Sequence, residues 1–272
     1  NSVPSYFAGC VNGKCEGAGS LASERVVVHR VRSPFFTGPL RSPIRLQNTF
    51  AHESFMDEIA TSLKVDPVAL RLRYLRDPHM IEVLKLATER AAWKTRSSAR
   101  RDAMNGEAAA YGRGVACVAY EGDNGFAALV AEVRVFRTEG RVVPMRFTIA
   151  IDSGPVSNPD GLRNQTEGGI LQGLSRALCE RVTWDGRKIT STDWESYQSL
   201  YLDMETPEIN VVIVNRADGP ATGAGETAIT LVAAAVGNAI YDATGIRLRE
   251  VPFTPDRIKA AVKKSTAENQ LV

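Results

Sequence analysis

A carboxylate behind two glycines is the part of the sequence that could most directly do chemistry. The stretch reads Gly223, Ala224, Gly225, Glu226, and the almost uncharged run 229–243 follows it. Glycines let the backbone approach a ligand closely, and the apolar run predicts a helix that removes the carboxyl group from water. Desolvation raises a carboxyl pKa, which is one way to make a general base that works near neutrality. Spacing alone favours a simpler interpretation, a first-turn residue that only faces the helix dipole.

Two arginines and an amide form a second candidate site. Arg41, Arg45 and Gln47 lie together around Pro43, in backbone that we expect not to be helical. A helix is expected from Asn48, and its free N–H groups could hold an anion together with the guanidinium groups. The functional interpretation is a phosphate or carboxylate site. Surface arginines in a loop are the alternative, which these residues alone favour.

The cysteines leave two interpretations open. Cys10 and Cys15 flank Asn12-Gly13, a strong β-hairpin signal, so they are expected to stand opposite each other. A cross-strand disulfide and two free thiols fit this arrangement equally well. Cys117 and Cys179 are isolated in the sequence, and no pair has the spacing of an iron–sulfur site. We therefore expect no electron relay within this chain.

Composition describes an ordinary globular protein. The 272 residues are 44% hydrophobic and 24% charged, with a formal net charge of +2. Nucleic acid is not an expected partner, because no basic block is interleaved with aromatic residues. No apolar run reaches the roughly 18 residues that span a bilayer and no signal peptide is recognisable, so we expect a soluble chain. It begins at Asn1, which suggests a processed product, a recombinant product or a fragment of something longer.

The elements that must position these residues change in type along the chain. Residues 1–39 are expected to hold the hairpin, an irregular segment and a strand at 25–31. Residues 40–95 are the arginine loop and helical part, with helices at 48–64, 66–75 and 78–93. Asp66-Pro67 supplies an N-cap and a first helical position for the second of these helices. Residues 96–110 are the predicted linker.

The second part, residues 111–262, is predicted to be strands crossed by helices. Strands are expected at 114–120, 127–137, 142–152, 182–184 and 209–215, with a turn at 138–140. A glycine-rich helix is expected from Asn158-Pro159 to about Glu180. Each glycine costs about 1 kcal/mol in a helix, so close packing against a cofactor or another backbone is implied. A last helix is expected from Thr254-Pro255 to about Val262, before a tail at 263–272. The predicted class is α+β in two lobes.

Three segments together resemble the molybdenum-binding subunit of the xanthine oxidase and aldehyde oxidase family. Leu40 to Pro43 with Gln47 to Glu58 is similar to its arginine loop and following helix. Asp152 to Pro159 with Gln165 to Gly173 is similar to its long pterin-side helix. Gly223-Ala224-Gly225-Glu226 is similar to its G-x-G-E signature. The resemblance runs from Leu40 to Val262 and is greatest to the isoquinoline 1-oxidoreductase and nicotinate dehydrogenase type.

The resemblance implies a molybdopterin-binding fold and a molybdenum hydroxylase that uses water as its oxygen source. Glu226 would be the base that takes a proton from a metal-bound hydroxide, and Arg41 would orient the substrate. Molybdenum would be held by the pterin dithiolene and by no side chain. Ile44 stands where the family commonly has glycine, which is expected to alter the path of the loop. The residues expected beside the cofactor are Gln165, Gly223, Ala224, Gly225, Gln47 and Asn48.

Cofactor and partners follow from the same resemblance. The cofactor would be molybdenum–molybdopterin, in the cytosine dinucleotide form, with iron–sulfur clusters or haem only in partner subunits. A further half-site for the dinucleotide is lacking, so we expect the C-terminal portion of a subunit, inactive without the remaining molybdenum-binding segment. Electron-transfer subunits with iron–sulfur clusters, cytochrome or flavin are expected to complete a bacterial heteromeric complex. A disulfide between Cys10 and Cys15 would indicate an oxidising compartment, which favours a periplasmic or membrane-associated location over a cytoplasmic one.

The expected substrate is a small N-heteroaromatic compound similar to nicotinate or isoquinoline, with an aldehyde as the alternative. Tyr120 and Phe126 would either line a substrate funnel or only pack in the core. A non-catalytic structural half of a redox complex is an alternative of another class. An unrelated nucleotide-binding domain is disfavoured, because no G-x-G-x-x-G follows a strand and no P-loop lysine is present.

Overall fold

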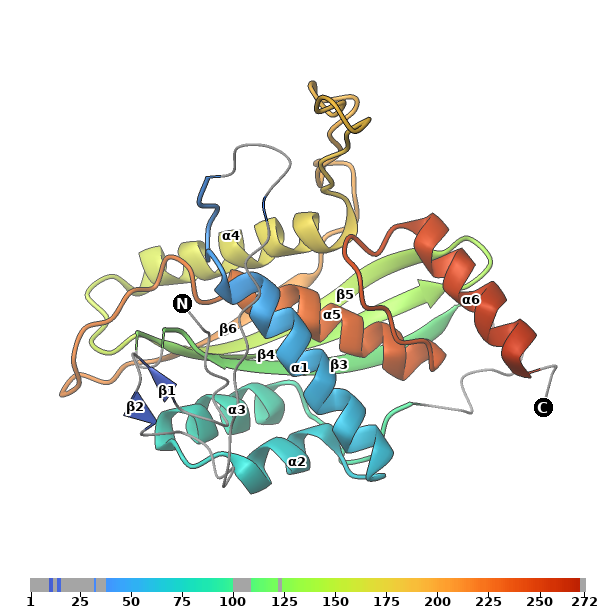
Figure 1. Ribbon diagram of the computed structural model, residues 1–272. Coiled ribbons are helices and arrows are strands. Elements are labelled where there is room, and N and C mark those ends of the chain that lie inside the picture. Colours follow the sequence, from blue (N-terminus) through green and yellow to red (C-terminus); the bar gives the residue numbers. More distant parts are fainter. Residues whose placement is uncertain are drawn as a thin grey trace.

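A four-stranded mixed sheet with helices on both faces forms the body of the molecule (Figure 1). The computed structural model describes residues 10–11, 14–15, 32, 38–99, 109–121 and 124–269, with side chains for 32, 38–99, 109–121 and 124–264. The sheet order is β3-β4-β5-β6. The first three strands are antiparallel, and β6 is parallel to β5. Their bounds are β3 Ala110–Ala119, β4 Phe126–Phe136, β5 Arg141–Asp152 and β6 Glu208–Val214.

One face of the sheet is covered by the glycine-rich helix and by the helix that follows the Gly223–Glu226 motif. These are α4, Pro159–Leu178, and α5, Ile229–Thr244. Every second residue of the central strands, such as Leu129 and Ile149, points into this core. Successive side chains of a strand point to opposite faces of the sheet, so the residues between them point to the other face. α5 is buried along nearly its whole length. A final helix, α6 Pro255–Asn269, lies beside β5.

The other face is covered by α2, Pro67–Tyr74, and α3, Pro78–Arg90. The side chains of Asp66 and Asp77 accept hydrogen bonds from the first free N–H groups of these helices, and a proline follows each cap. Both helices share one apolar cluster with β3, β4 and β5. The first helix, α1 Arg45–Ser62, packs mainly against α5 and also contacts α2, whereas α3 packs directly onto β4 and β5.

Glycines in β3 set the distance between the sheet and α5. A Cβ atom on Gly112 would lie 2.0 Å from the carbonyl oxygen of Ala239, and one on Gly114 would lie 2.2 Å from that of Ala235. Both distances are far inside van der Waals contact. The backbone of α5 therefore lies directly against β3, and this holds the N-terminus of α5 over the end of the sheet.

Most predicted elements are confirmed, but several boundaries and one predicted strand are wrong. β3 begins at Ala110 rather than Gly114, and α3 ends at Arg90 rather than Trp93. α1 begins at Arg45 rather than Asn48, because Pro43 blocks helix only before itself and not after. α6 continues to Asn269, past the predicted end at Val262. Residues 182–184 form no strand; they contribute only an isolated bridge between Trp184 and Ile189. The turn at 138–140 is confirmed, with Gly140 in a left-handed conformation.

Several N-terminal predictions fall largely outside the described residues. The hairpin pairing is confirmed at the backbone, because β1 Cys10–Val11 and β2 Lys14–Cys15 are antiparallel with Cys10 opposite Cys15. The side chains of both cysteines lie outside the described part, and so does the strand predicted at 25–31. Residues 100–108 of the linker are likewise not described, so the division into domains stays a prediction.

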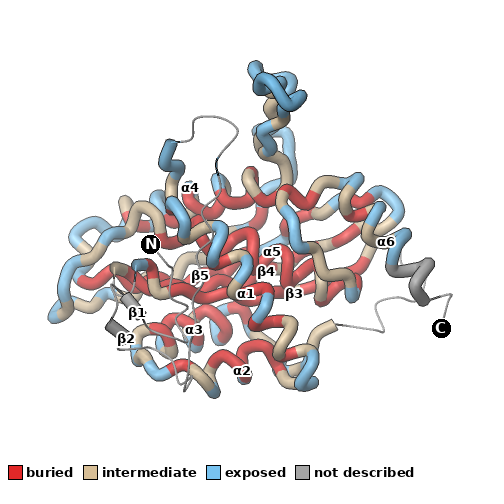
Figure 2. The backbone as a smooth tube through the Cα atoms, in the orientation of Figure 1, coloured by how far each residue is buried: buried red, intermediate tan, exposed pale blue. Residues whose placement is uncertain are grey.

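A long excursion separates α4 from β6. Residues 181–205, which we call the arm, leave the body beyond the end of α4 and return to the sheet edge (Figure 1). All of the arm is exposed or half-buried, in contrast to α4, which has a buried face (Figure 2). Within the described residues, no helix has the length and apolar character that a membrane span requires.

Candidate active site

The Glu226 carboxylate is held from two directions. Its Oε2 accepts a hydrogen bond of 2.5 Å from the Tyr120 hydroxyl, at the end of β3. Its Oε1 accepts one of 3.1 Å from the backbone N–H of Ser42. The Ser42 hydroxyl also donates to the Glu226 carbonyl oxygen, at 2.5 Å. Residues 223–226, which we call the glycine loop, are therefore bound to the arginine loop through both the side chain and the main chain of Glu226.

Arg41 joins the three segments that the sequence analysis had selected. Its Nε donates to the Gly225 carbonyl at 2.5 Å, and its Nη2 donates to the Gln165 carbonyl at 3.3 Å. Its Nη1 donates to the Gln172 side-chain oxygen at 3.2 Å. Arg176, one turn further along α4, donates to the Arg41 carbonyl at 3.0 Å. All three nitrogens of the Arg41 guanidinium are thus occupied, so Arg41 holds the arginine loop, α4 and the glycine loop together.

The arginine loop makes this contact through two left-handed residues. Ser42 has φ of 62° and Ile44 has φ of 68°. A β-branched side chain is strongly disfavoured in this region, which glycine adopts freely. The loop therefore follows a path that suits glycine, although Ile44 stands there. The prediction that Arg45 to Gln47 are not helical is wrong, since α1 begins at Arg45.

The glycines of α4 divide between two faces. A Cβ atom on Gly173 would lie 2.7 Å from Cγ2 of Val232, and one on Gly169 would lie 3.4 Å from Arg41 Nη2 and from Ala228. These two glycines let α4 pack closely against α5 and the arginine loop, as predicted from their number. Gly168 meets nothing within 4 Å and is exposed, so it leaves open space above α4 between the exposed side chains of Gln165 and Gln172.

The electrostatics of Glu226 differ from the prediction. Hydrogen bonds from Tyr120 and from the Ser42 N–H, with the nearby Arg41 charge, outweigh desolvation and lower the pKa of Glu226. The expected elevation is therefore wrong, because the side chain is only half-buried and its oxygens meet donors. Burial, followed by the hydrogen bond to Glu226, raises the pKa of Tyr120. Burial and the neighbouring Arg176 lower the pKa of Arg41. At neutral pH Glu226 is an ionised carboxylate beside a neutral phenol.

A second turn supports the glycine loop from below. Gly154, with φ of 77°, lies against Pro220, and Thr222 N donates to the Ser153 carbonyl at 3.1 Å. On the other side, Gly223 N donates to the Asn124 side chain at 2.8 Å. The sequence Asp152-Ser153-Gly154 therefore contributes by supporting the loop that carries Glu226.

Several groups in this region suit a hydrogen-bonding cofactor. The hydroxyls of Thr222 and Thr227, on either side of the glycine loop, are buried and have no hydrogen-bond partner among the described residues. The exposed Gln165 side chain reaches the loop, since a Cβ atom on Gly225 would lie 3.5 Å from Gln165 Nε2. Unsatisfied buried hydroxyls are uncommon, and amide and hydroxyl donors beside flexible glycines are what a polar ring system requires. These residues fit a pterin.

Two of the predicted cofactor residues belong to α1 and not to the three segments that Arg41 joins. Gln47 and Asn48 are exposed on the first turn of α1, and their assignment to a cofactor stays a prediction. Ala224 is half-buried and packs against the apolar core. In the described part of the chain, no group of three or more His, Cys, Asp and Glu side chains could hold a metal.

Sequence reasoning missed two residues of the site and left a third undecided. Ser42 had no motif of its own, and its contribution comes from a backbone N–H and a hydroxyl. Arg176 could have been found, because it lies four residues after Gln172 and so on the same face of a helix. Tyr120 was considered for a funnel or for core packing; it is buried, and its hydroxyl also contacts the carboxylate.

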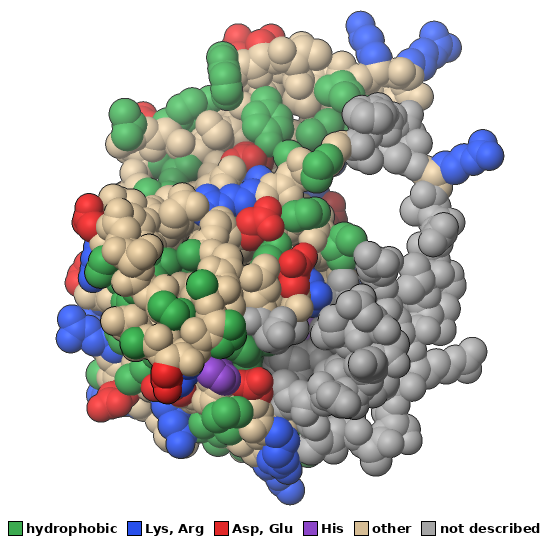
Figure 3. Space-filling view, turned by 90° about the vertical axis from the view of Figure 1, so that its left-hand side faces the viewer, with side chains coloured by type: hydrophobic (Ala, Val, Ile, Leu, Met, Phe, Trp, Pro, Cys, Tyr) green, Lys and Arg blue, Asp and Glu red, His purple; other side chains and the backbone are tan. Residues whose placement is uncertain are grey.

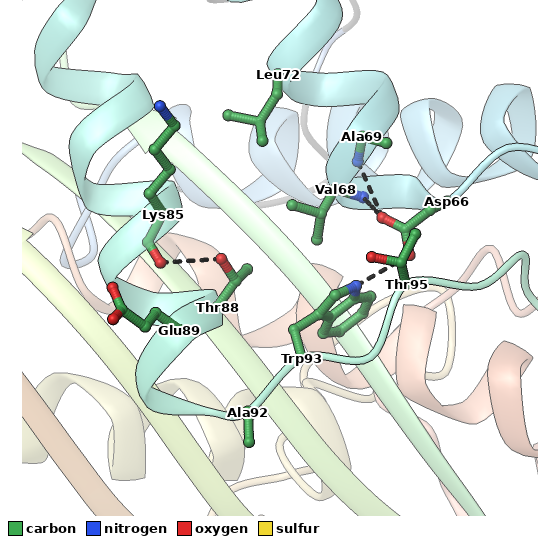
Figure 4. A pocket seen from close by; sticks show the side chains of 10 residues that line it. All are labelled: Asp66, Val68, Ala69, Leu72, Lys85, Thr88, Glu89, Ala92, Trp93 and Thr95. Carbon is green, nitrogen blue, oxygen red and sulfur yellow. Dashed lines mark hydrogen bonds between the residues drawn. The ribbon is translucent and has the colours of Figure 1, made fainter.

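A separate pocket lies on the opposite face of the sheet. It has a volume of about 480 Å³ between α2 and α3, and Asp66 and Trp93 stand at its wall (Figure 4). The Asp66 carboxylate is already satisfied there by two helix N–H groups and by Trp93 Nε1 at 3.0 Å.

On the side shown in Figure 3, basic and acidic side chains are interspersed and do not gather by sign. The Glu226 region therefore remains the candidate active site.

The fold and the site define a molybdopterin cofactor-binding domain. A family model described in these words, "Molybdopterin cofactor-binding domain", matches residues 119–204. The aldehyde oxidoreductase from Desulfovibrio gigas has a similar fold, with a TM-score of 0.69, 17% identity, and coverage of 83% of this chain and 42% of that one.

Two curated proteins are similar to this chain in sequence. A nicotinate dehydrogenase subunit of Pseudomonas putida is 39% identical over 228 residues, which are 82% of this chain and 19% of that protein. The beta subunit of isoquinoline 1-oxidoreductase from Brevundimonas diminuta is 36% identical, over 77% of this chain and 26% of that protein. The chain is similar to these relatives over most of its own length and spans about a fifth to a quarter of theirs.

Proposed function

We propose that this chain provides the catalytic base and part of the cofactor wall of an enzyme that hydroxylates an N-heteroaromatic compound. The observation that carries the proposal is the ionised Glu226 carboxylate, fixed by Tyr120 and Ser42 where the arginine loop, α4 and the glycine loop meet. The relatives named for nicotinate and isoquinoline support the substrate class.

In this proposal Glu226 accepts a proton at the reacting centre. Its lowered pKa keeps it ionised at neutral pH, and the two donated hydrogen bonds fix the direction of its oxygens. A base must point at the proton that it removes, and such orientation contributes as much as basicity. When bound, the molybdopterin group would supply the two-electron redox chemistry. Closure of the site around it would exclude water and strengthen Glu226 as a base.

The residues that would hold the cofactor lie around the glycine loop. The Gln165 amide, the Thr222 hydroxyl and the backbone of Gly223 and Gly225 would bond its polar edge. Gly168 leaves the space above α4 that a bulky group needs. The cytosine dinucleotide form is the one that we propose. Gln47 and Asn48 would lie further out along it, on the first turn of α1.

Arg41 has a positioning role in this proposal. Its guanidinium nitrogens already bond Gly225, Gln165 and Gln172, so it sets the position of the loop that carries Glu226. A direct contact with the substrate would require one of these bonds to exchange. The Nη1 bond, to the exposed Gln172 side chain, is the one that can exchange most easily.

Partner segments are part of the proposal. The relatives are named as subunits, and this chain spans a minor share of each. We propose that the remaining molybdenum-binding segment completes the cofactor site, and that electron-transfer subunits with iron–sulfur clusters, cytochrome or flavin reoxidise it. A periplasmic or membrane-associated location is proposed with them.

The test uses the complete native assembly. Elemental analysis and cofactor extraction should give molybdenum, a pterin and cytidine monophosphate. Glu226→Gln should lower turnover of nicotinate-type substrates by about 10²- to 10⁴-fold, the usual contribution of a general base, while molybdenum content stays constant. Glu89→Gln, at an exposed position on α3, is the matched control and should be unchanged.

The outcomes separate the alternatives. Full turnover in Glu226→Gln would show that this chain is a non-catalytic structural half. Turnover of aldehydes in preference to N-heterocycles, with the same loss in Glu226→Gln, would keep the mechanism and change the substrate class. An assembly with neither molybdenum nor pterin would reject the proposal.

A further inference from the structure

The arm, residues 181–205, carries seven of the thirteen large apolar side chains that are exposed in the described part of the chain. Leu202 is fully exposed, at 106%, and Trp194 is 78% exposed. Trp184 is 52% exposed, and four more large apolar side chains of the arm are exposed: Val182, Ile189, Tyr201 and Met204. Clustered exposed apolar side chains on a soluble domain mark an interaction surface. Tryptophan and tyrosine are the residues most often found at the energetic centre of an interface.

The arm has a defined conformation in spite of its exposure. The Asp185 side chain accepts hydrogen bonds from the N–H groups of Arg187 and Lys188, which closes a turn within the arm. The Tyr201 hydroxyl donates to the Trp194 carbonyl at 2.8 Å, which joins the outgoing and returning parts of the arm. A surface that is already ordered loses little conformational entropy when it binds.

The base of the arm is fastened to the body. The Tyr197 hydroxyl donates to the Glu180 carboxylate at 2.7 Å, and burial together with this bond raises the pKa of Tyr197 to about 12. Leu200 N donates to the Ser175 hydroxyl of α4 at 2.9 Å. The projecting part therefore has a fixed direction relative to α4, the helix that forms one wall of the candidate site.

We propose that the arm docks the remaining segment of the molybdenum-binding subunit, a proposal that rests on the function proposed above. The match to the cofactor-binding domain runs through the arm to Met204, so the arm belongs to this domain and is not an added insertion. The chain spans only 19% and 26% of its two relatives. In such a subunit, the remaining segment of the polypeptide is a permanent neighbour of this domain.

The charges on the arm favour a protein partner over a lipid surface. Asp193 and Glu195 directly flank the exposed Trp194. The arm as a whole has five carboxylates against three basic side chains, Arg181, Arg187 and Lys188. Carboxylates beside a tryptophan oppose its insertion into an anionic membrane, where basic neighbours are typical. The receptor is therefore expected to be an apolar surface on protein, with basic side chains at its rim.

Photo-crosslinking in the complete assembly tests this proposal. Benzoylphenylalanine is placed at position 194 or 202 on the arm and, as a matched control, at Phe55, which is also exposed but lies on α1. The expected result is a crosslink from both arm positions to peptides of the remaining molybdenum-binding segment. The control position should give none of these crosslinks.

Other crosslinks would overturn it. Crosslinks to a second copy of this chain, to an electron-transfer subunit or to lipid would each assign the arm to another partner, and no arm crosslink would leave it without one. Molybdenum content and turnover are measured on the same samples. A wrong docking partner in an active, molybdenum-containing assembly refutes only the docking, whereas an inactive, molybdenum-free assembly refutes the proposed function.

Discussion

At the residue scale, two hydrogen-bond donors hold the Glu226 carboxylate in place. Glu226 has one hydrogen bond to each oxygen, from Tyr120 and from Ser42 N–H. Both favour the charged form, so the pKa of the carboxyl is lowered even though its helix is buried. The ordinary expectation that burial raises a carboxyl pKa fails here because the carboxylate lies at the helix entrance, where donors reach it.

Tyr120→Phe should raise the pKa of Glu226 towards its ordinary value. The phenol donates the largest of the hydrogen bonds that lower it. A base works only when deprotonated, so activity is lost as pH falls through this pKa, and the acid limb of kcat/KM should move to higher pH. NMR titration of ¹³C-labelled glutamate, assigned by comparison with Glu226→Gln, measures the shift directly. Tyr111→Phe, at an exposed tyrosine of the same strand, should leave both curves in place.

Ile44→Gly should stabilise the chain. A left-handed non-glycine residue costs about 1–3 kcal/mol, and glycine gives back roughly 0.5–1 kcal/mol through the greater freedom of the unfolded chain. A net gain of about 1 kcal/mol in the free energy of unfolding is expected, measured by urea denaturation. Ile44→Val keeps the branched side chain at φ of 68° and should show no gain. Equal stability of the three chains would mean that Ile44 is not strained.

At the element scale, close approach of backbones is what brings the site together. α5 lies directly against β3 through Gly112 and Gly114, and α4 lies against α5 through Gly173. These contacts place the first turn of α5, and with it Glu226, next to Tyr120 at the end of β3. A larger residue at any of the three would move a helix and so separate donors from the carboxylate.

Gly114→Ala should be strongly destabilising. Its Cβ atom would lie 2.2 Å from the Ala235 carbonyl oxygen, and a backbone atom cannot rotate away. Overpacking of this kind costs about 1–3 kcal/mol or more, measured as a loss in the free energy of unfolding. Gly168→Ala is the control, since its Cβ atom meets nothing and alanine favours helix by about 0.5–1 kcal/mol. A neutral Gly114→Ala would contradict the described contact between β3 and α5.

At the scale of the whole molecule, one buried carboxylate connects the two sides of the sheet. Asp152, at the end of β5, accepts hydrogen bonds from Gly154 N and from Arg216, and His79 Nδ1 of α3 lies 3.1 Å from it. Burial alone would raise the pKa of Asp152, but these partners together lower it. Helix α3, the sheet and the chain leading to the glycine loop thus meet at this side chain.

Asp152→Asn should destabilise the fold at neutral pH by about 1–3 kcal/mol, because it leaves buried partners unsatisfied. A depressed folded-state pKa gives stability that is present above the unfolded value and lost as pH falls through the folded value. The difference between the two chains should therefore shrink in acid, as urea denaturation at several pH values would show. Asp256→Asn, at an exposed pair with Lys259, should leave the free energy of unfolding almost unchanged, because a surface ion pair contributes little.

Local chemistry explains which features could be predicted. The capped starts at Asp66 and Asn158 and the turn at Gly140 depend on neighbouring residues, so the sequence alone located them. The contacts of Arg41 with Gly225 and of Tyr120 with Glu226 join residues more than one hundred positions apart. Their proximity depends on helix–sheet packing that no local pattern contains. The sign of the Glu226 pKa shift was missed for the same reason, since its donors come from distant segments.

The support beneath the glycine loop has a consequence for the order of folding. Arg216 N and Thr222 N donate to the carbonyls of Gly154 and Ser153, just past the end of β5. The chain reaches these positions only through β6, which pairs with β5 along its whole length. We therefore expect the N–H groups of Arg216 and Thr222 to gain these partners only once the last strand has joined the sheet. The supported form of the loop that carries Glu226 would then be among the last features of the fold to form.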